Sequence, residues 1–131
     1  MSIRILIVDD EPDFIETMVK RFTFRKMPVT AATSGIEALK LLEAEAFDVV
    51  IMDVRMPGKD GIETLKEIKK RAPLTEVIML TGHASVESGM RGMSLGAYDY
   101  VLKPVDFEEL LDKVRKAYER KQLNEGRQSA D

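Results

Sequence analysis

The sequence predicts an α/β protein with a flavodoxin-like (βα)5 fold, a doubly wound parallel sheet with the strand order 2-1-3-4-5. Five short apolar runs alternate along the chain with five segments whose apolar residues recur at helical spacing. This alternation predicts parallel strands joined by right-handed crossovers, with helices on both faces of the sheet. The central run, residues 49–52, is apolar without interruption, which is typical of a strand that is buried on both faces.

The predicted strands are short and rich in β-branched residues, and most of them stop at polar or turn-forming residues. The second strand is expected near an edge of the sheet, because Pro28 precedes it. The five strands are expected at residues 3–8, 29–32, 47–53, 77–80 and 98–102.

The helices that alternate with these strands carry recognisable start signals. Pro12 suits the first turn of the first helix, where its missing N–H costs nothing. Ser34 and Asp106 are expected to cap the second and the last helix. The fourth helix contains Gly89 and Gly92, each of which costs a helix about 1 kcal/mol relative to Ala, so we expect it to be the least rigid. The first helix buries an apolar stripe made of Phe14, Ile15, Met18, Val19 and Phe22.

The composition is that of one globular domain. The 131 residues are 44% hydrophobic and 33% charged, which is enough to build a core without disulfides. The chain has no Cys, as fits a reducing cytoplasm, and no apolar run near the roughly 20 residues that span a bilayer. A net charge of −3 argues against direct contact with nucleic acid. We expect a cytoplasmic domain at residues 1–121 and a polar tail or linker at 122–131, with the last helix fraying from Glu119.

Side chains that can bind a metal ion or a phosphoryl group follow four of the five predicted strands. The first strand ends in Asp9 and Asp10, the third in Asp53, the fourth in Thr81 and the fifth in Lys103. Parallel strands place these ends along one edge of the sheet, and the first and third strands adjoin the crevice where α/β folds bind ligands. Clustered carboxylates repel each other unless a cation intervenes, and oxygen ligands suit Mg²⁺. The sequence therefore predicts a magnesium site at this edge.

Each of these residues also has a simpler interpretation. Asp53 could cap the turn that follows it, as Asp often does. Asp9 and Asp10 could stabilise the N-terminus of the first helix, although one acid would be enough for that. Thr81 could bond the local backbone, and Lys103 could be a solvated surface lysine. The joint placement at one sheet edge favours the functional interpretation.

Four motifs together resemble the receiver domain of bacterial two-component response regulators. They are Asp9-Asp10 after the first strand, the segment VIMDVRMPG at residues 50–58, Thr81-Gly82-His83, and Lys103-Pro104. The resemblance covers roughly residues 3 to 120 and is greatest to receivers of transcription regulators of the enhancer-binding type. It implies a phosphorylation-dependent switch that catalyses only its own phosphorylation and dephosphorylation.

The resemblance also implies a role for each matching residue. Asp53 accepts a phosphoryl group from a phosphohistidine of a sensor histidine kinase. Mg²⁺ is held by the side chains of Asp10 and Asp53 and by the Arg55 carbonyl, with Asp9 assisting. Thr81 and Lys103 bind the phosphoryl oxygens, and the Lys103–Pro104 peptide is cis. Positioning and charge neutralisation account for most of the catalysis of phosphoryl transfer, so these few groups are sufficient.

The resemblance further implies a switch. Thr81 moves toward the phosphoryl group, and Tyr100 swings into the space that Thr81 leaves, although Tyr100 could also be an ordinary half-buried strand tyrosine. The output surface is then the fourth helix, fifth strand and fifth helix, used for a homodimer or for a target. Arg55 and His83 flank the site. We expect Arg55 to slow self-hydrolysis, so that Arg55→Asn loses its phosphate faster, while His83 could equally be an exposed loop residue.

Two alternatives of other classes lack their sequence signals. An aspartyl-phosphate phosphatase of the haloacid dehalogenase kind needs its nucleophile after the first strand and a second Asp two residues further on. In this chain the residue two positions after Asp53 is Arg55. An FMN carrier needs a Ser/Thr/Gly-rich loop after the first strand, where this chain has Asp-Asp-Glu-Pro. Within the receiver interpretation, the domain either precedes an output domain that controls transcription or acts alone through protein contacts.

Overall fold

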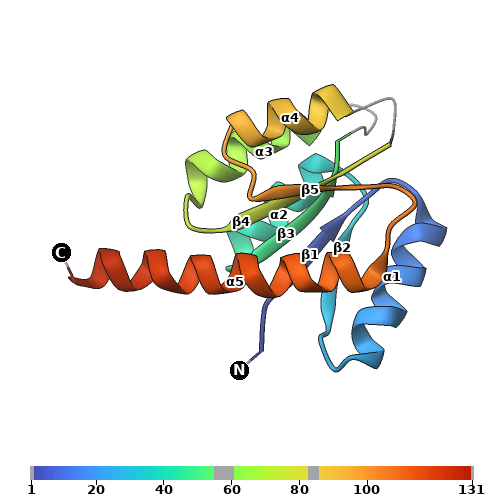
Figure 1. Ribbon diagram of the computed structural model, residues 1–131, viewed down its shortest axis with the longest axis horizontal. Coiled ribbons are helices and arrows are strands. Elements are labelled where there is room, and N and C mark those ends of the chain that lie inside the picture. The colour runs from blue at the N-terminus through green and yellow to red at the C-terminus, as the bar shows by residue number, and fades with distance from the viewer. Residues whose placement is uncertain (1, 55–60, 83–85, 131) are drawn as a thin grey trace.

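The computed structural model describes the backbone of residues 2–54, 61–82 and 86–130. Five strands and five helices alternate within these residues (Figure 1). The strands are β1 (Ile5–Val8), β2 (Val29–Ala32), β3 (Val49–Asp53), β4 (Glu76–Thr81) and β5 (Asp99–Leu102). The helices are α1 (Pro12–Phe24), α2 (Gly35–Ala44), α3 (Gly61–Arg71), α4 (Val86–Ser94) and α5 (Phe107–Ala130).

All five strands form one parallel sheet in the order β2-β1-β3-β4-β5, which confirms the predicted fold and strand order. The central strand β3 pairs with β1 on one side and with β4 on the other, so that Val50 lies beside Leu6 and Val77. β2 lies at an edge, as Pro28 before it indicates.

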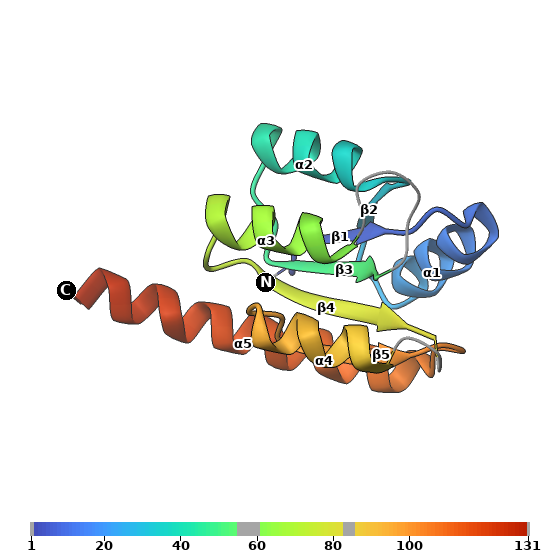
Figure 2. The ribbon, with the colours of Figure 1, turned by 90° about the horizontal axis from the view of Figure 1, so that it is seen from above.

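The helices cover both faces of the sheet. α2, α3 and α4 lie on one face, and α1 and α5 lie on the other (Figures 1 and 2). Each layer encloses its own apolar core. Val50 and Met52 of β3 join the core under α2 and α3, whereas Val49 and Ile51 join the core under α1 and α5. This division follows from the period of two along a strand, since alternate side chains point to opposite faces.

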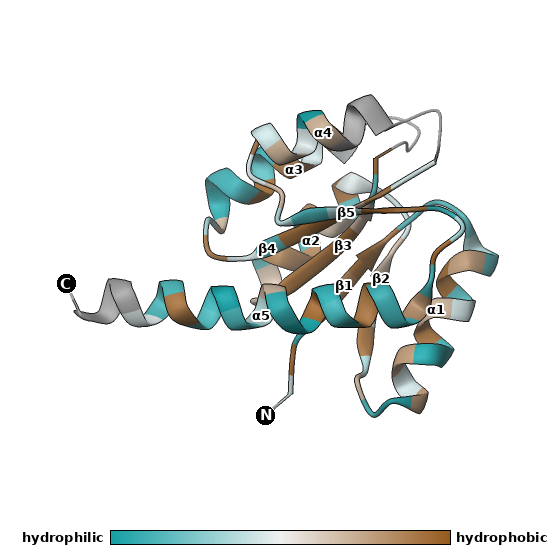
Figure 3. Ribbon diagram, in the orientation of Figure 1, coloured by the Kyte–Doolittle hydropathy of each residue, from teal (hydrophilic) through white to brown (hydrophobic). Residues whose placement is uncertain are grey.

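The strands are the most hydrophobic part of the chain, whereas polar and apolar residues alternate along the helices (Figure 3). Every residue of β3 is buried, including its last residue, Asp53. The uninterrupted apolar run at residues 49–52 therefore forms a strand buried on both faces, as predicted.

The predicted helix starts are confirmed. Pro12 is the first residue of α1. The Ser34 hydroxyl oxygen accepts a hydrogen bond from the Glu37 N–H at 3.1 Å and caps α2. The Asp106 carboxylate accepts hydrogen bonds from the Glu108 N–H at 3.0 Å and the Glu109 N–H at 3.3 Å, and so caps α5.

The end of α5 differs from the expectation of a frayed helix from Glu119. α5 continues to Ala130 and extends past the sheet (Figure 1). Two ion pairs hold the extension. Arg120 contacts Glu76 at the start of β4, with Nη2 and Oε1 2.8 Å apart, and Lys121 Nζ lies 3.1 Å from Asp48 Oδ1, just before β3. Both acids lie far from α5 in the sequence, so these ion pairs could not be recognised there. The polar composition of the segment therefore predicted a tail. The proposed division between residues 121 and 122 stays a prediction.

Candidate phosphoacceptor site

Asp9, Asp53 and Thr81 lie at the carboxyl ends of neighbouring strands and are buried. Asp9 follows β1 and is 0% exposed, Asp53 ends β3 and is 8% exposed, and Thr81 ends β4 and is 1% exposed. The strand order places β1 beside β3 and β3 beside β4, so the sheet brings the three residues together. This is the edge of the sheet at which the sequence predicts a site.

Four acids converge at this edge. One carboxylate oxygen from each of Asp9, Asp10, Glu11 and Asp53 lies within 4.8 Å of the others. Asp9 and Asp53 are buried, while Asp10 and Glu11 are exposed. Asp9 Oδ1 also accepts a hydrogen bond from the Glu11 N–H at 2.9 Å, but Glu11 precedes α1, and no side chain among the described residues caps that helix.

Lys103 brings one positive charge into this cluster. Its Nζ lies 2.9 Å from Asp9 Oδ2, 3.0 Å from Asp53 Oδ2 and 3.6 Å from Glu11 Oε1. The Lys103 backbone N–H donates to the Thr81 carbonyl at 2.7 Å, which ties the residue to β4. The Lys103–Pro104 peptide is cis, as the resemblance implies. Lys103 is therefore not a solvated surface lysine, and 21% of its side chain is exposed.

Burial and charge act against each other in the cluster. Burial raises the pKa of the Asp9 carboxyl above its ordinary value, and the nearby Asp53 adds to the rise, although Lys103 opposes it. Burial alone acts to lower the pKa of Lys103, but hydrogen bonds to Asp9 and Asp53 outweigh burial and hold that pKa above its ordinary value. The ammonium stays charged, and two carboxylates share it.

The ligand atoms present at this edge fit a hard divalent cation. Four carboxylates face one ammonium within the described residues, which leaves an excess of negative charge. Oxygen ligands of this kind are those that Mg²⁺ and Ca²⁺ prefer. The side chains of Asp10 and Asp53, predicted as ligands, both belong to the group, and so does Asp9. The other predicted ligand, the Arg55 carbonyl, lies outside the described residues.

The Thr81 hydroxyl is buried, and its Oγ1 has no hydrogen-bond partner among the residues that the structure describes. Leaving a buried hydroxyl without a hydrogen-bond partner costs about 1–3 kcal/mol of folding free energy. Such a hydroxyl is unusual for a threonine with a purely structural role. Local backbone bonding by Thr81, the simpler interpretation, is not observed among those residues. His83, two residues further on, lies outside the described residues.

Tyr100 lies on β5, opposite Met79 of β4, and its side chain is half-buried. It packs against the apolar core under α2 and α3, on the face of the sheet that α4 also covers. The structure thus places Tyr100 on the α4 side of the sheet, and its role as a switch stays a prediction.

The backbone of Gly61 lies directly against the backbone of Asp53 and Val54, a close contact that was not predicted from the sequence. Its N–H donates to the Val54 carbonyl at 2.9 Å. A Cβ atom added to Gly61 would lie 2.4 Å from the Asp53 carbonyl oxygen and 2.7 Å from Val54 Cα. The first residue of α3 is therefore in direct backbone contact with the end of β3, an approach that only glycine permits.

Two further residues contact Lys103 without having been predicted as site residues. They are Glu11, at 3.6 Å, and Phe14, whose ring centroid lies 4.5 Å from Lys103 Nζ. Phe14 was assigned to the apolar stripe of the first helix, and its spacing carries no signal of the contact with Lys103.

The family model of the response regulator receiver domain matches residues 5–115. The chain belongs to this family. The Regulatory protein AtoC of Escherichia coli (strain K12) is 42% identical to this receiver domain over 107 residues, which are 82% of the chain and 23% of AtoC. The Transcriptional regulatory protein ZraR of Klebsiella oxytoca is 35% identical over 127 residues, which are 95% of the chain and 28% of ZraR. The receiver domain thus spans about a quarter of the length of these two relatives.

Solved structures agree with this assignment. A response regulator receiver domain protein from Clostridium thermocellum matches with a TM-score of 0.88 and 34% identity, over 92% of this receiver domain and 98% of that chain. NtrX from Brucella abortus matches with a TM-score of 0.91 and 28% identity, over 100% of this receiver domain and 30% of that chain.

None of the helices described for this receiver domain is long and apolar enough to cross a membrane.

Proposed function

We propose that this receiver domain accepts a phosphoryl group on Asp53 from a phosphohistidine of a sensor histidine kinase. The observation that supports the proposal is the placement of the Asp53 carboxylate at the end of β3, 3.0 Å from the Lys103 ammonium and within a group of four acids. A carboxylate that attacks a phosphoryl group must overcome anion–anion repulsion, and nearby cations reduce that repulsion.

In the proposed reaction an Asp53 carboxylate oxygen attacks phosphorus and forms a P–O bond. The P–N bond to the kinase histidine breaks, and its electron pair stays on the imidazole, which takes up a proton. Lys103 and the Thr81 hydroxyl then bind phosphoryl oxygens, which gives the buried Thr81 Oγ1 the partner it lacks among the described residues. Hydrolysis of the resulting acyl phosphate by water resets the domain.

Asp10 and Asp53 would hold Mg²⁺ through their side chains and Arg55 through its carbonyl, with Asp9 assisting. When bound, the ion offsets the negative charge of the phosphoryl oxygens. The exposure of Asp10 leaves this part of the site open to solvent.

We further propose that phosphorylation changes the surface formed by α4, β5 and α5, and that this surface controls a downstream output. Apolar side chains exposed there support an interface. Met90 and Met93 of α4 are 62% and 40% exposed, and Leu102 of β5 is 36% exposed. The similarity to AtoC and ZraR favours transcription as the output, and their greater length favours an output domain as the partner. A homodimer through this surface is a further part of the proposal. A receiver that acts alone through protein contacts is the alternative.

Incubation with Mg²⁺ and acetyl phosphate, followed by measurement of the intact mass, tests the acceptor residue. The wild type should gain one phosphoryl group, which chelation of Mg²⁺ should abolish. Asp53→Ala should gain none, whereas Asp112→Ala, which removes an exposed acid of α5, should behave as the wild type does. Equal labelling of Asp53→Ala would refute the proposal. An unchanged NMR spectrum around Thr81, Tyr100 and α4 after full phosphorylation would refute the switch alone.

A further inference from the structure

Lys103 is enclosed on one side by an aromatic ring. The Lys103 Nζ lies 4.5 Å from the centroid of the Phe14 ring, well within the roughly 6 Å over which a cation is attracted to a ring face. Phe14 lies in the first turn of α1, and Lys103 follows β5, so 89 positions of sequence separate the two. The contact forms only because the fold brings α1 beside the carboxyl end of β5.

The remaining sides of the ammonium face carboxylates. Asp9 Oδ2 and Asp53 Oδ2 lie at 2.9 and 3.0 Å, and Glu11 Oε1 lies at 3.6 Å. Three acceptors and one ring therefore surround the group. A lysine carries four flexible methylene groups and loses much rotamer freedom when it is held in one place, so each contact that restricts it contributes to its position.

We propose that Phe14 is a positioning residue of the phosphoacceptor site, whose ring holds the Lys103 ammonium against Asp53 and Asp9 and screens it from water. The proposal deepens the proposed function and rests on it for its kinetic consequence. A cation under an aromatic face keeps its charge and gives up no hydrogen-bond donor to the ring, so its N–H groups remain directed at the carboxylates and at an arriving phosphoryl group.

Core packing alone does not require an aromatic ring at position 14. The apolar core under α1 and α5 is built around buried residues such as Met18 and Phe22, whereas Phe14 is only half-buried at its margin. A leucine would cover the same apolar surface, but it has no π face for an ammonium. Replacing Phe14 by Leu therefore separates the two roles.

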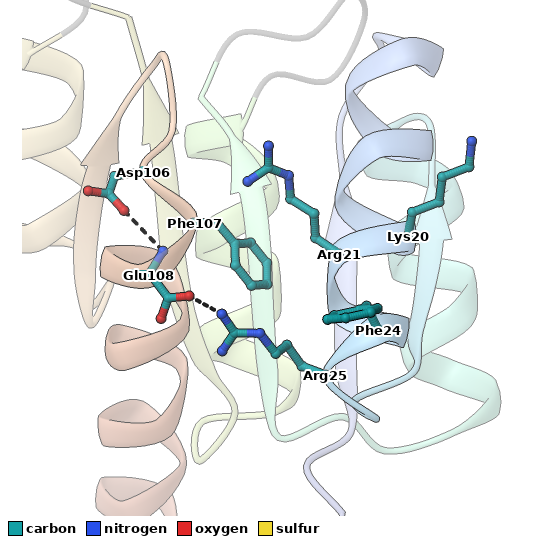
Figure 4. A pocket seen from close by; sticks show the side chains of 7 residues that line it. All are labelled: Lys20, Arg21, Phe24, Arg25, Asp106, Phe107 and Glu108. Atoms are coloured by element: carbon teal, nitrogen blue, oxygen red, sulfur yellow. Dashed lines mark hydrogen bonds and ion pairs between the residues drawn. The ribbon is translucent and has the colours of Figure 1, made fainter.

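α1 offers a matched control in Phe24. This residue is 85% exposed and lies in the groove between α1 and the start of α5, among Lys20, Arg21 and Arg25 (Figure 4). It is an aromatic residue on the same helix that is not part of the Lys103 cluster. Phe24→Leu removes a ring without changing the surroundings of the ammonium.

NMR tests the contact directly. In the wild type we expect cross-relaxation between the Phe14 ring protons and the Lys103 ε-methylene protons, and an upfield ring-current shift of those methylene protons. The shift should disappear in Phe14→Leu, persist in Phe14→Tyr and be unaffected in Phe24→Leu. Relaxation of the Lys103 side chain should show greater mobility in Phe14→Leu alone. Absence of the cross-relaxation, or equal mobility in all four proteins, would overturn the proposal.

Phosphorylation by acetyl phosphate with Mg²⁺ supplies the functional test. Phe14→Leu should lower the rate at saturating acetyl phosphate about fivefold, the equivalent of about 1 kcal/mol, while Phe14→Tyr restores it and Phe24→Leu leaves it unchanged. An equal loss in Phe14→Tyr would overturn the role of the ring face, as would a normal rate in Phe14→Leu. If the wild type accepts no phosphoryl group, the proposed function fails, and the mobility of Lys103 decides the positioning role by itself.

Discussion

The two ends of strand β4 carry charged clusters of opposite character. At the carboxyl end, beyond Thr81, four acids converge, and three of them contact Lys103, the one cation of this cluster among the described residues. At the amino end, Glu76 is one buried acid that faces two cations, Arg120 and Lys69. The same strand thus begins in a cluster with excess positive charge and ends in one with excess negative charge.

The amino-end cluster is complete. The Glu76 side chain is 3% exposed and accepts two hydrogen bonds from the Arg120 guanidinium, which also lies 4.6 Å from the centroid of the Tyr98 ring. Lys69 Nζ donates to the Pro73 and Thr75 carbonyls, each at 2.9 Å. Burial lowers the pKa of Lys69 despite the nearby Glu76. The charged atoms of this cluster therefore have protein partners, as expected of a structural network.

The carboxyl-end cluster is incomplete. Asp9 and Asp53 share one ammonium, and the buried Thr81 hydroxyl lacks a hydrogen-bond partner among the described residues. Burial also raises the pKa of Asp9, so the charged carboxylate is held at an energetic cost. A site with unmet bonding capacity in the protein alone suits the binding of a cation and an oxyanion. The comparison separates a cluster that stabilises the fold from one that is suited to chemistry.

The largest effect of a single substitution is expected at the carboxyl end, from Gly61→Ala. The new Cβ would lie 2.4 Å from the Asp53 carbonyl oxygen, and both groups belong to backbone that is fixed by α3 and β3. We expect the free energy of unfolding to fall by about 3 kcal/mol, together with weaker phosphorylation by acetyl phosphate, because the end of β3 is displaced.

Gly126→Ala in the extension of α5 is the matched control for Gly61→Ala. A Cβ at Gly126 meets no atom within 4 Å, and Ala favours helix over Gly by about 1 kcal/mol, so this variant should be slightly more stable. Urea denaturation monitored by circular dichroism measures both variants. Wild-type stability of Gly61→Ala would contradict the backbone contact.

A smaller loss is expected at the amino end, from Glu76→Gln. The amide keeps the shape of the side chain but leaves Arg120 and Lys69 without a negative partner. Breaking a buried pair costs about 3–5 kcal/mol, and since 46% of the Arg120 side chain is exposed we expect about 2 kcal/mol. Phosphorylation of Asp53 should stay at the wild-type rate, because the change lies at the opposite end of β4.

Glu16→Gln provides the control for Glu76→Gln. It removes one partner of the exposed pair that Glu16 forms with Lys20 on α1, and should change the free energy of unfolding by less than about 0.5 kcal/mol. Thermal unfolding of the two variants beside the wild type gives the comparison. Equal losses in both would show that burial of Glu76 does not matter.

The sequence was sufficient to predict the carboxyl-end cluster. Apolar runs mark the strands, polar residues mark where each run stops, and parallel strands bring those stops to one edge. Asp9, Asp53 and Lys103 could therefore be placed together before any coordinates, and the structure brings their charged atoms within hydrogen-bonding distance.

The amino-end cluster could not be predicted in the same way. Glu76 precedes the apolar run of β4, where a charged residue is expected simply because the strand begins there. Its partner Arg120 lies 44 residues away in a polar segment. Likewise, Phe14 fits the apolar stripe of a helix, and nothing in its spacing reveals an ammonium above its ring. Contacts between distant residues depend on how helices pack on the sheet, and a single sequence carries no direct signal for that packing.

Two buried threonines allow the smallest and most selective test of the contrast between the two ends. Thr75, just before β4, is 5% exposed and donates its hydroxyl hydrogen to the Phe47 carbonyl at 2.8 Å. Thr81, the last residue of β4, is 1% exposed and its Oγ1 has no such partner among the described residues. Substitution by Val keeps the shape of each side chain and removes only the hydroxyl.

Thr75→Val should lower the free energy of unfolding by about 1 kcal/mol, because the Phe47 carbonyl loses its donor. Thr81→Val should leave stability equal or raise it, because a buried hydroxyl without a partner is replaced by a methyl group. The effects on phosphorylation should be reversed: Thr81→Val should slow labelling by acetyl phosphate, and Thr75→Val should not. Denaturation and labelling of both variants measure this. A stability loss in Thr81→Val as large as that in Thr75→Val would mean that its hydroxyl has a structural partner, and the contrast between the two ends of β4 would then fail.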